Sequence, residues 1–433
     1  MGKFVNLGRL LAATSAGVLM LMAGLSALAQ DQPAEKLPAA ATGKLITLEE
    51  CLHIAYERQP ALAAYRASLA SAQTAEAALQ QLRGAAVLIS PDLPIRRHQA
   101  SIGVAIAEAT LHQAELDTAD AVTRMYYTVM YARAQLEVAT TVTEDFRFYR
   151  DRVKEGVEGK PKKGEKAPPK EWTTDTVDKL EVYHGIAASR REEALKGIER
   201  AKAALREAMG VGCDFVFDVP EGPLPSPVVK ICKDEIIALA KSQRGEVIRA
   251  TRAVEIFNLE IDAQCKHMCP GAYRTFASGA DIHADPVPAG SRNGEYHPGA
   301  VGPEMPVELA GSRSMRMERA RDLSGRAAAV AEKAENLVAL EAEDTYLRWR
   351  QAVDQAAVLR TAAESGKKLA DNTREAFRGG QKVTVEDVLT NGAVSAQARS
   401  AYNEALLHQL ITLSALERVT GGGFCAGLAK PLK

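Results

Sequence analysis

Apolar residues recur at steps of three and four along most of this 433-residue chain, which places them on one face of an α-helix. Between Thr47 and Arg83 the stripe consists of Leu48, Leu52, Ala55, Leu62, Leu69, Ala72, Leu79 and Leu82. An ordinary helical core gives the same stripe, so the lengths of the predicted helices decide more than the stripe itself. The pattern predicts long helices and few strands.

Each half of the chain predicts three helices. In the first half they span about 47–83, 94–154 and 177–209, and in the second about 234–268, 314–378 and 385–418. At 1.5 Å per residue, those of the second half are about 52, 97 and 51 Å long, so the two shorter helices together match the long one. Two short helices stacked end to end beside a long one would form a rod. The predicted fold class is mostly α, with long antiparallel coiled-coil-like helices.

The two halves repeat one plan. The stretch 46–67 aligns with the stretch 185 residues further on, so that Glu50 falls on Glu235. "DTVDKL" then aligns with "TVEDVL", and the halves close alike in "ALREAMGVGC" and "ALERVTGGGFC". Three matches in the same order are hard to explain by chance similarity between alanine-rich helices. They indicate two tandem repeats.

The first thirty residues have the features of an export signal. Lys3 and Arg9 precede the apolar run "LLAATSAGVLMLMAGLSALA", and Ala27-Leu28-Ala29 fits a cleavage site. A retained membrane anchor is the alternative, but the polar, Pro- and Ala-rich stretch that follows favours cleavage. No other run is long and apolar enough to predict a membrane-spanning helix.

The predicted organisation follows from these boundaries. It consists of a signal peptide at 1–29, a disordered linker at 30–44, a helical hairpin of repeat 1 at 45–213, an inter-repeat linker at 214–232, a helical hairpin of repeat 2 at 233–425 with a loop at 270–313, and a C-terminal tail at 426–433.

The turn before the last helix carries helix-capping residues. In "GGQKVTVEDVL", Gly379 and Gly380 end one helix, and Thr384 is a natural N-cap with an acid, Asp387, three residues on. The first half is expected to repeat this arrangement with Asp175 and Asp178. Acids are stabilising at helix N-termini, so capping alone would account for them.

At this point the residues resemble those of a known family. "GGQKVTVEDVL" followed by "SAQARSAYNEALLHQLITLSALERVTGG" resembles the closing helix of the outer membrane efflux protein family, of which TolC is the type. "LITLEECLHIAYERQPALAAYRASLASA" resembles its opening helix, and "DAVTRMYYTVMYARAQLEVA" the descending helix of its first repeat. The resemblance covers most of the chain from Leu45 to Gly423.

The resemblance implies a homotrimer whose protomers form an α-helical tunnel, located in the outer membrane or periplasm of a Gram-negative-type cell. It implies a conduit of a tripartite efflux or type I secretion system, working with a periplasmic adaptor and an inner-membrane pump. In that family the turn before the closing helix is the periplasmic tip, which docks the adaptor and holds the aperture. The matching residues here are Asp175, Asp178, Gly379, Gly380, Lys382, Thr384 and Asp387.

Two features depart from the family pattern. Thr390 stands where the family type has a further acid, and the Lys- and Pro-rich "KPKKGEKAPPKEW" is inserted in the first turn as an expected exposed loop. The family also places a membrane hairpin between the first and second helices of each half, but "GAAVLISPDL" is too short and 270–311 too rich in Pro and Gly. We therefore expect barrel strands to be reduced or absent. A periplasmic coiled-coil scaffold without transport is the alternative function.

The six cysteines raise two further hypotheses. In "CKHMC", Cys265, His267 and Cys269 have the ligand types of a metal site, but on an intact helix His267 points away from both cysteines, which favours a helix end with incidental thiols. The other four cysteines are expected near one level of the rod. A bridge between Cys213 and Cys232, with another between Cys51 and Cys425, is the first-ranked pairing, and four unpaired thiols are the alternative.

Other functions have little support in the sequence. The formal net charge of −1 gives no electrostatic argument for nucleic acid as a partner. No phosphate-binding Gly-rich loop, H-E-x-x-H or G-x-S-x-G motif occurs. An enzyme is therefore the weakest hypothesis, and no cofactor or metal is predicted.

Overall fold

The computed structural model describes residues 44–84, 89–159, 172–275, 282–283, 302–303, 308–379 and 383–428. All of them belong to one of two compact units of the chain, Lys44–Lys433. The predicted signal peptide lies outside the described residues, as do Gly380, Lys382 and most of the predicted loop and insertion.

Two sets of four helices follow one another with the same lengths. The first set is α1 (Leu48–Arg58), α2 (Pro60–Gln81), α4 (Leu93–Glu158) and α5 (Thr174–Ala208); the second is α6 (Lys233–Gln243), α7 (Gly245–Lys266), α8 (Arg313–Arg378) and α9 (Val385–Val419). Corresponding helices contain 11, 22, 66 and 35 residues in both sets. The predicted, mostly helical fold with two tandem repeats is confirmed.

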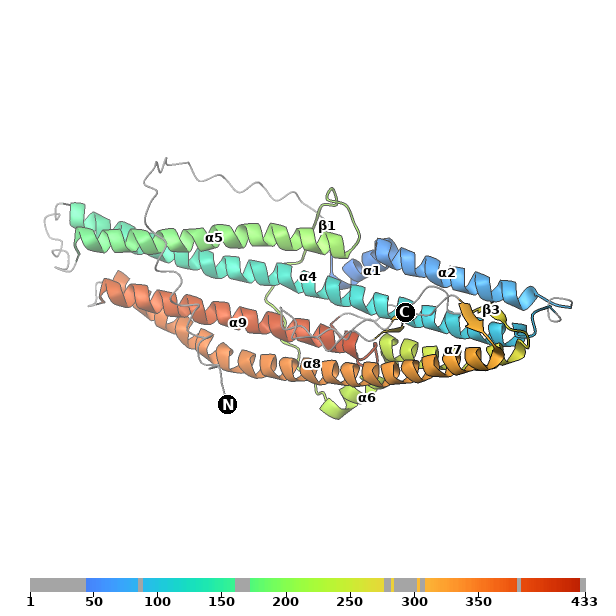
Figure 1. Ribbon diagram of the computed structural model, residues 1–433. Coiled ribbons are helices and arrows are strands. Elements are labelled where there is room, and N and C mark those ends of the chain that lie inside the picture. Colours follow the sequence, from blue (N-terminus) through green and yellow to red (C-terminus); the bar gives the residue numbers. More distant parts are fainter. Residues whose placement is uncertain are drawn as a thin grey trace, which may run out of the picture. The chain divides into compact units, whose positions relative to one another are not determined.

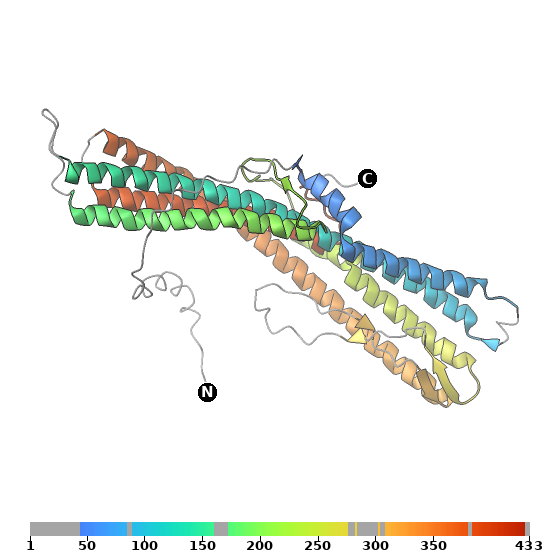
Figure 2. The same cartoon turned by 90° about the horizontal axis from the view of Figure 1, so that it is seen from above.

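The long helices α4 and α8 organise the others (Figures 1 and 2). Along one part of their length, α5 packs on α4 and α9 packs on α8; along the other part, α2 packs on α4 and α7 on α8. The helix α4 also packs against both α9 and α7 of the other repeat. It therefore joins the two repeats into one bundle.

The strands are short. β1 (Lys44–Leu45) pairs in parallel with β2 (Phe217–Asp218), which ties the start of repeat 1 to the link between the repeats. β3 (Gly271–Arg274) pairs antiparallel with β6 (Glu308–Gly311), and β4 (Ile282–His283) with β5 (Gly302–Pro303). Between Arg83 and Pro94 the described residues contain no strand. The prediction of reduced strands is thus confirmed for the described residues.

The largest hydrophobic core lies where the two repeats meet, around α1, the middle of α4, the end of α5 and the second half of α9. Its fully buried side chains include Cys51, Val122, Leu205 and Leu410. Among the helices that the structure describes, none is both long and apolar enough to cross a membrane.

The opening helix of each half is interrupted, which the apolar stripe did not predict. Gln59 and Arg244 adopt extended backbone conformations, with ψ of 116° and 131°, and separate α1 from α2 and α6 from α7. Pro60 is the first residue of α2 and has no N–H to continue the ladder, which explains the first break. The predicted helices 47–83 and 234–268 are therefore each two helices, and α7 already ends at Lys266.

A glycine lies against the backbone at each of these two breaks, just after the last helix of the same repeat. Gly210 has φ of +68° and Gly421 φ of +63°, conformations that L-residues with a side chain rarely adopt. A Cβ atom on Gly210 would lie 2.6 Å from Gln59 Cα, and one on Gly421 2.5 Å from the carbonyl oxygen of Gln243. Both glycines are required by the close approach of two backbones.

Candidate functional site

Four helix ends meet at one end of the bundle, and we call this region the tip. It comprises the last turns of α4 and α8 and the first turns of α5 and α9, residues 145–158, 172–187, 371–379 and 383–392. The starts of α5 and α9 lie side by side, since Lys179 Nζ and Glu386 Oε2 are 3.8 Å apart. β3, which begins two residues after Cys269, lies near the opposite end of the long helices (Figure 1).

The start of α9 is capped as the sequence predicts. Thr384 is the N-cap, and its hydroxyl accepts a hydrogen bond from the Asp387 N–H at 3.1 Å. In return, the Asp387 carboxylate accepts from the Thr384 hydroxyl at 2.6 Å and from the Thr384 N–H at 3.1 Å. This capping box fixes the direction in which the chain enters α9.

In the first half the cap is displaced from the predicted position. Thr173 is the N-cap of α5, and the residue at the third helical position is Thr176, whose hydroxyl accepts from the Thr173 N–H at 3.4 Å. Asp175 lies in the first turn, and Asp178 lies one turn further on. The hypothesis that Asp178 caps α5 is therefore wrong, because corresponding residues of α5 and α9 are 211 apart rather than the 209 inferred from the sequence.

The cap of α9 should depend on pH. Hydrogen bonds from the Thr384 hydroxyl and then from its N–H hold the pKa of Asp387 below its usual value. The stabilisation is fully present above the unfolded-state pKa of about 3.9 and is lost as the pH falls through the lower folded-state pKa. We expect the first-turn amides of α9 to lose hydrogen-exchange protection over that acidic range.

Two substitutions separate charge from capping. Asp387→Asn keeps an acceptor oxygen, so the hydrogen bonds from Thr384 to residue 387 should remain while their pH dependence disappears. Asp387→Ala should remove these bonds and the pH dependence, and leave only the bond from its N–H to the Thr384 hydroxyl. Glu386→Gln is the matched control, because Glu386 is the exposed neighbour that pairs with Lys179. Equal protection of α9 in wild type and Asp387→Ala would contradict the prediction.

An aromatic cluster joins helix ends of the two repeats at the tip. Phe377, in the last turn of α8, lies edge-on to Tyr149 with ring centroids 5.0 Å apart. Trp172, just before α5, stacks on Phe377 at 5.9 Å. Sequence reasoning missed this cluster, although the run "FRFYR" at 146–150 stood out in a chain with 5% aromatic residues. Because these rings come from both repeats, they hold the helix ends of the tip together.

A half-buried ion pair lies beside the aromatic cluster. Arg374 Nη1 and Asp145 Oδ1 are 2.7 Å apart. Burial raises the pKa of Asp145, and the charges of Arg374 and Arg378 oppose this rise without cancelling it. The pair therefore carries a desolvation cost that its attraction must offset.

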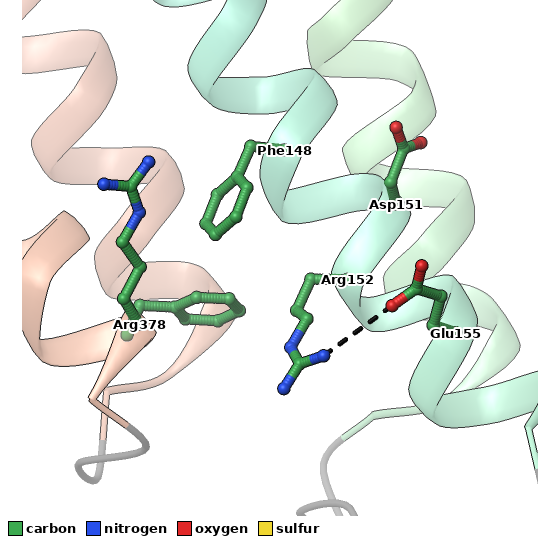
Figure 3. A pocket seen from close by; sticks show the side chains of 6 residues that line it. Phe148, Asp151, Arg152, Glu155 and Arg378 are labelled. Carbon is green, nitrogen blue, oxygen red and sulfur yellow. Dashed lines mark ion pairs between the residues drawn. The ribbon is translucent and has the colours of Figure 1, made fainter.

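An open pocket of about 490 Å³ lies between the ends of α4 and α8 (Figure 3). It is lined by Phe148, Asp151, Arg152, Glu155, Phe377 and Arg378. The Arg378 guanidinium lies over the Phe148 ring, 4.9 Å from its centroid, and Arg152 pairs with Glu155 at 3.7 Å. The pocket thus combines an aromatic surface with charges of both signs, which suits a peptide segment of a partner better than a small apolar ligand.

The residues that the sequence suggested for a metal site do not converge. His267 follows the last residue of α7; its ring stacks on Tyr273 with centroids 4.0 Å apart, and its Nε2 lies 3.3 Å from Asp92 Oδ2. In the part of the chain that the structure describes, no group of three His, Cys, Asp or Glu side chains is placed to hold a metal ion.

The predicted disulfides are not formed, because all six cysteines are free. Cys51 is buried in the core around α1, whereas Cys213, Cys232 and Cys425 are exposed. Cys425 lies beside Glu417, whose carboxylate it hydrogen-bonds. Cys51 is therefore enclosed by core side chains rather than available to Cys425.

The fold is similar to that of known channels. No protein-family model and no curated protein sequence matches the chain. The solved structure of the outer-membrane channel OprN matches with a TM-score of 0.66 and 15% identity over 93% of this chain and 99% of that one. The outer membrane protein VceC from Vibrio cholerae matches at 0.65 and 16% over 87% and 96%, and the MtrE outer membrane channel of Neisseria gonorrhoeae at 0.59 and 17% over 87% and 89%. The resemblance to outer membrane efflux channels is thereby confirmed for the fold.

Proposed function

We propose that the mature chain is the conduit of a tripartite efflux or type I secretion system. It is exported by its signal peptide and acts at the outer membrane or in the periplasm. Three copies enclose a helical tunnel, and the tip docks a periplasmic adaptor that connects the tunnel to an inner-membrane pump. In this proposal the chain binds and positions partners and does no chemistry.

The observation that carries this proposal is the extent of the structural match. OprN, described as an outer-membrane channel, is matched over 99% of its length, so the helical plan of a whole channel protomer is present here. A short helical match could come from any bundle, but a match of this extent includes both repeats and their order.

The surface of the tip is consistent with docking. On α5, next to the aromatic cluster, Val182, Tyr183 and Ile186 are 61%, 41% and 56% exposed. Apolar side chains at such spacing form a strip along one helix, and exposed apolar strips mark interaction surfaces. We assign this strip to contacts with the adaptor or a neighbouring protomer, with Asp175, Asp178, Gly379, Gly380, Lys382, Thr384 and Asp387 in the proposed aperture region.

The test is to image the purified mature protein by electron microscopy and to determine its mass in solution. A trimer with an open lumen along the helices would support the conduit. A trimer or monomer with a solid helical bundle would contradict it and favour the scaffold. Ile186→Asp should weaken trimer formation or adaptor binding, whereas Ile186→Val, which keeps an apolar side chain at this exposed position, should not.

A further inference from the structure

Buried polar atoms without a hydrogen-bond partner gather where α4 of repeat 1 meets repeat 2. Among the described residues there are eight such side-chain atoms, and six belong to α4 or to residues of repeat 2 near it. The six are Gln113 Oε1, Asp145 Oδ1, Arg244 Nη1, Glu341 Oε2, Arg374 Nε and Arg418 Nε. Native proteins satisfy nearly all of their buried polar atoms, so a group of this kind indicates a bound ligand.

At the level of the break between α6 and α7, an aspartate of α4 faces an arginine of α9 across a gap. Arg418 Nε and Asp120 Oδ2 are 3.9 Å apart, which is too long for a direct hydrogen bond and within the span of one bridging water. Both side chains are held in place, since Ser414 Oγ donates to Asp120 Oδ1 at 2.8 Å and Arg418 Nη2 donates to Glu341 Oε1 at 2.7 Å. The gap is therefore fixed from both sides.

The same level contains three further unpartnered atoms, on side chains that are at most 5% exposed. Glu341 Oε2 lies 2.8 Å from Arg244 Nη1, but the two atoms are not aligned for a hydrogen bond. Gln113 Nε2 donates to Asp117 Oδ1 at 3.0 Å, which leaves Gln113 Oε1 as an unused acceptor. Donors and acceptors are thus both unpaired here, which suits a small neutral ligand that donates and accepts hydrogen bonds.

At the tip, a second aspartate of α4 faces a second arginine of repeat 2. Arg374 Nη1 lies 2.7 Å from Asp145 Oδ1 without hydrogen-bond alignment, and Asp145 Oδ1 and Arg374 Nε both lack a partner. A cavity of about 60 Å³ among α4, α8 and α9 lies beside this carboxylate, and its lining includes the polar side chains of Thr141, Thr373 and Ser395. Its volume exceeds the roughly 10–15 Å³ that one water molecule requires.

We propose that ordered water molecules bind at both levels and join α4 to the arginines of repeat 2. At each level one water accepts a hydrogen bond from the arginine Nε and donates one to the facing carboxylate. A cation would be repelled by the arginine and an anion by the aspartate, so a neutral ligand fits both partners. The inference goes beyond the proposed function and holds whether or not the chain forms a tunnel.

Water also explains how these partly buried charges remain solvated. Burial raises the pKa of Asp145, and a water on the free side of the carboxylate replaces part of the hydration that burial removes. The break of repeat 1 needs no such ligand, because Gln59 is neutral and its Nε2 donates directly to the carbonyl oxygens of Glu207 and Ala208 at 3.1 and 3.0 Å. The two breaks therefore differ in chemistry although their helices have the same lengths.

The experiment is a crystal structure of the purified mature protein at a resolution that shows ordered water. We expect one density peak within hydrogen-bond distance of Arg418 Nε and Asp120 Oδ2, and another within that distance of Arg374 Nε and Asp145 Oδ1. Asp120→Leu, which puts an apolar side chain of similar size in place of the carboxylate, should abolish the first peak and leave the second. Asp145→Leu should do the opposite, so each variant is the control for the other.

Crystals grown with rubidium bromide distinguish water from an ion, because bound rubidium or bromide scatters anomalously and water does not. The proposal is overturned if either position lacks a peak in the wild type, or if Arg418 Nε contacts Asp120 directly. An anomalous signal at the peaks would overturn it as well, as would peaks that persist in both variants. Circular dichroism shows whether each variant is folded, and the wild-type density decides the proposal if a variant is not.

Discussion

Replacing Gly421 with alanine should destabilise the protein by about 2–5 kcal/mol, the sum of two costs. A side chain in the left-handed region costs about 1–2 kcal/mol. Its Cβ would lie 2.5 Å from the Gln243 carbonyl oxygen and 2.7 Å from its carbon, and forcing packed atoms apart costs about 1–3 kcal/mol more. Urea denaturation of wild type and variant measures the difference in the free energy of unfolding.

The control is Gly427→Ala. Gly427 has φ of +70°, but a Cβ placed on it would meet nothing within 4 Å. It should therefore show only the backbone cost of about 1–2 kcal/mol. Gly210→Ala should behave like Gly421→Ala, because Gly210 covers the corresponding break in repeat 1. Equal stability losses at positions 421 and 427 would show that close approach to the break contributes nothing.

Replacing Glu341 with glutamine should cost about 3–5 kcal/mol, the typical loss when one member of a buried ion pair is removed. Glu341 Oε2 lies 2.8 Å from Arg244 Nη1, and its Oε1 accepts a hydrogen bond from Arg418 Nη2 at 2.7 Å. The Arg244 contact is an ion pair without hydrogen-bond geometry, so both of its atoms lack a hydrogen-bond partner among the described residues. Burial lowers the pKa of Arg244, but Glu341 and Glu246 outweigh burial and raise it.

In the Glu341→Gln variant, the guanidiniums of Arg244 and Arg418 repel each other without the negative charge of Glu341 between them. Glu343→Gln is the matched control on the same helix: Glu343 is 42% exposed and pairs with Lys233 at 3.0 Å. An exposed pair of this kind contributes about 0–1 kcal/mol. The same urea measurement applies, and a loss at Glu341 no larger than that at Glu343 would contradict the prediction.

The sequence predicted the helices best where local chemistry marks their ends. Gly379 and Thr384 place the end of α8 at Arg378 and the start of α9 at Val385, and both agree with the structure. The break at Gln59 had a local signal in Pro60, but the apolar stripe continues through it and hid the interruption. At Arg244 the local signal is weaker, because Gly245 stands where repeat 1 has Pro60; the break also lies against Gly421, far away in the sequence.

The candidate site was predicted only in part, for similar reasons. The cap of α9 depends on residues three apart, so the sequence contains it in full. The cap of α5 was predicted at the wrong residue because "DTVDKL" and "TVEDVL" resemble each other at an offset of 209, whereas α5 and α9 correspond at an offset of 211. The stacking of Trp172 on Phe377 joins residues of different repeats, and no local pattern reports such a contact.

The equal helix lengths of the two repeats have a consequence for how this chain could have changed since its duplication. One residue inserted into a helix turns everything beyond it by about 100° and shifts it by about 1.5 Å, which takes apolar residues out of the core. The connecting segments carry no such restriction: residues 159–173 and 379–384 occupy corresponding places but differ in length, as do 82–92 and 267–312. Insertions and deletions have accumulated between the helices and not within them. Helix packing has therefore conserved the lengths of the helices, whereas the amino-acid sequences of the two copies have diverged.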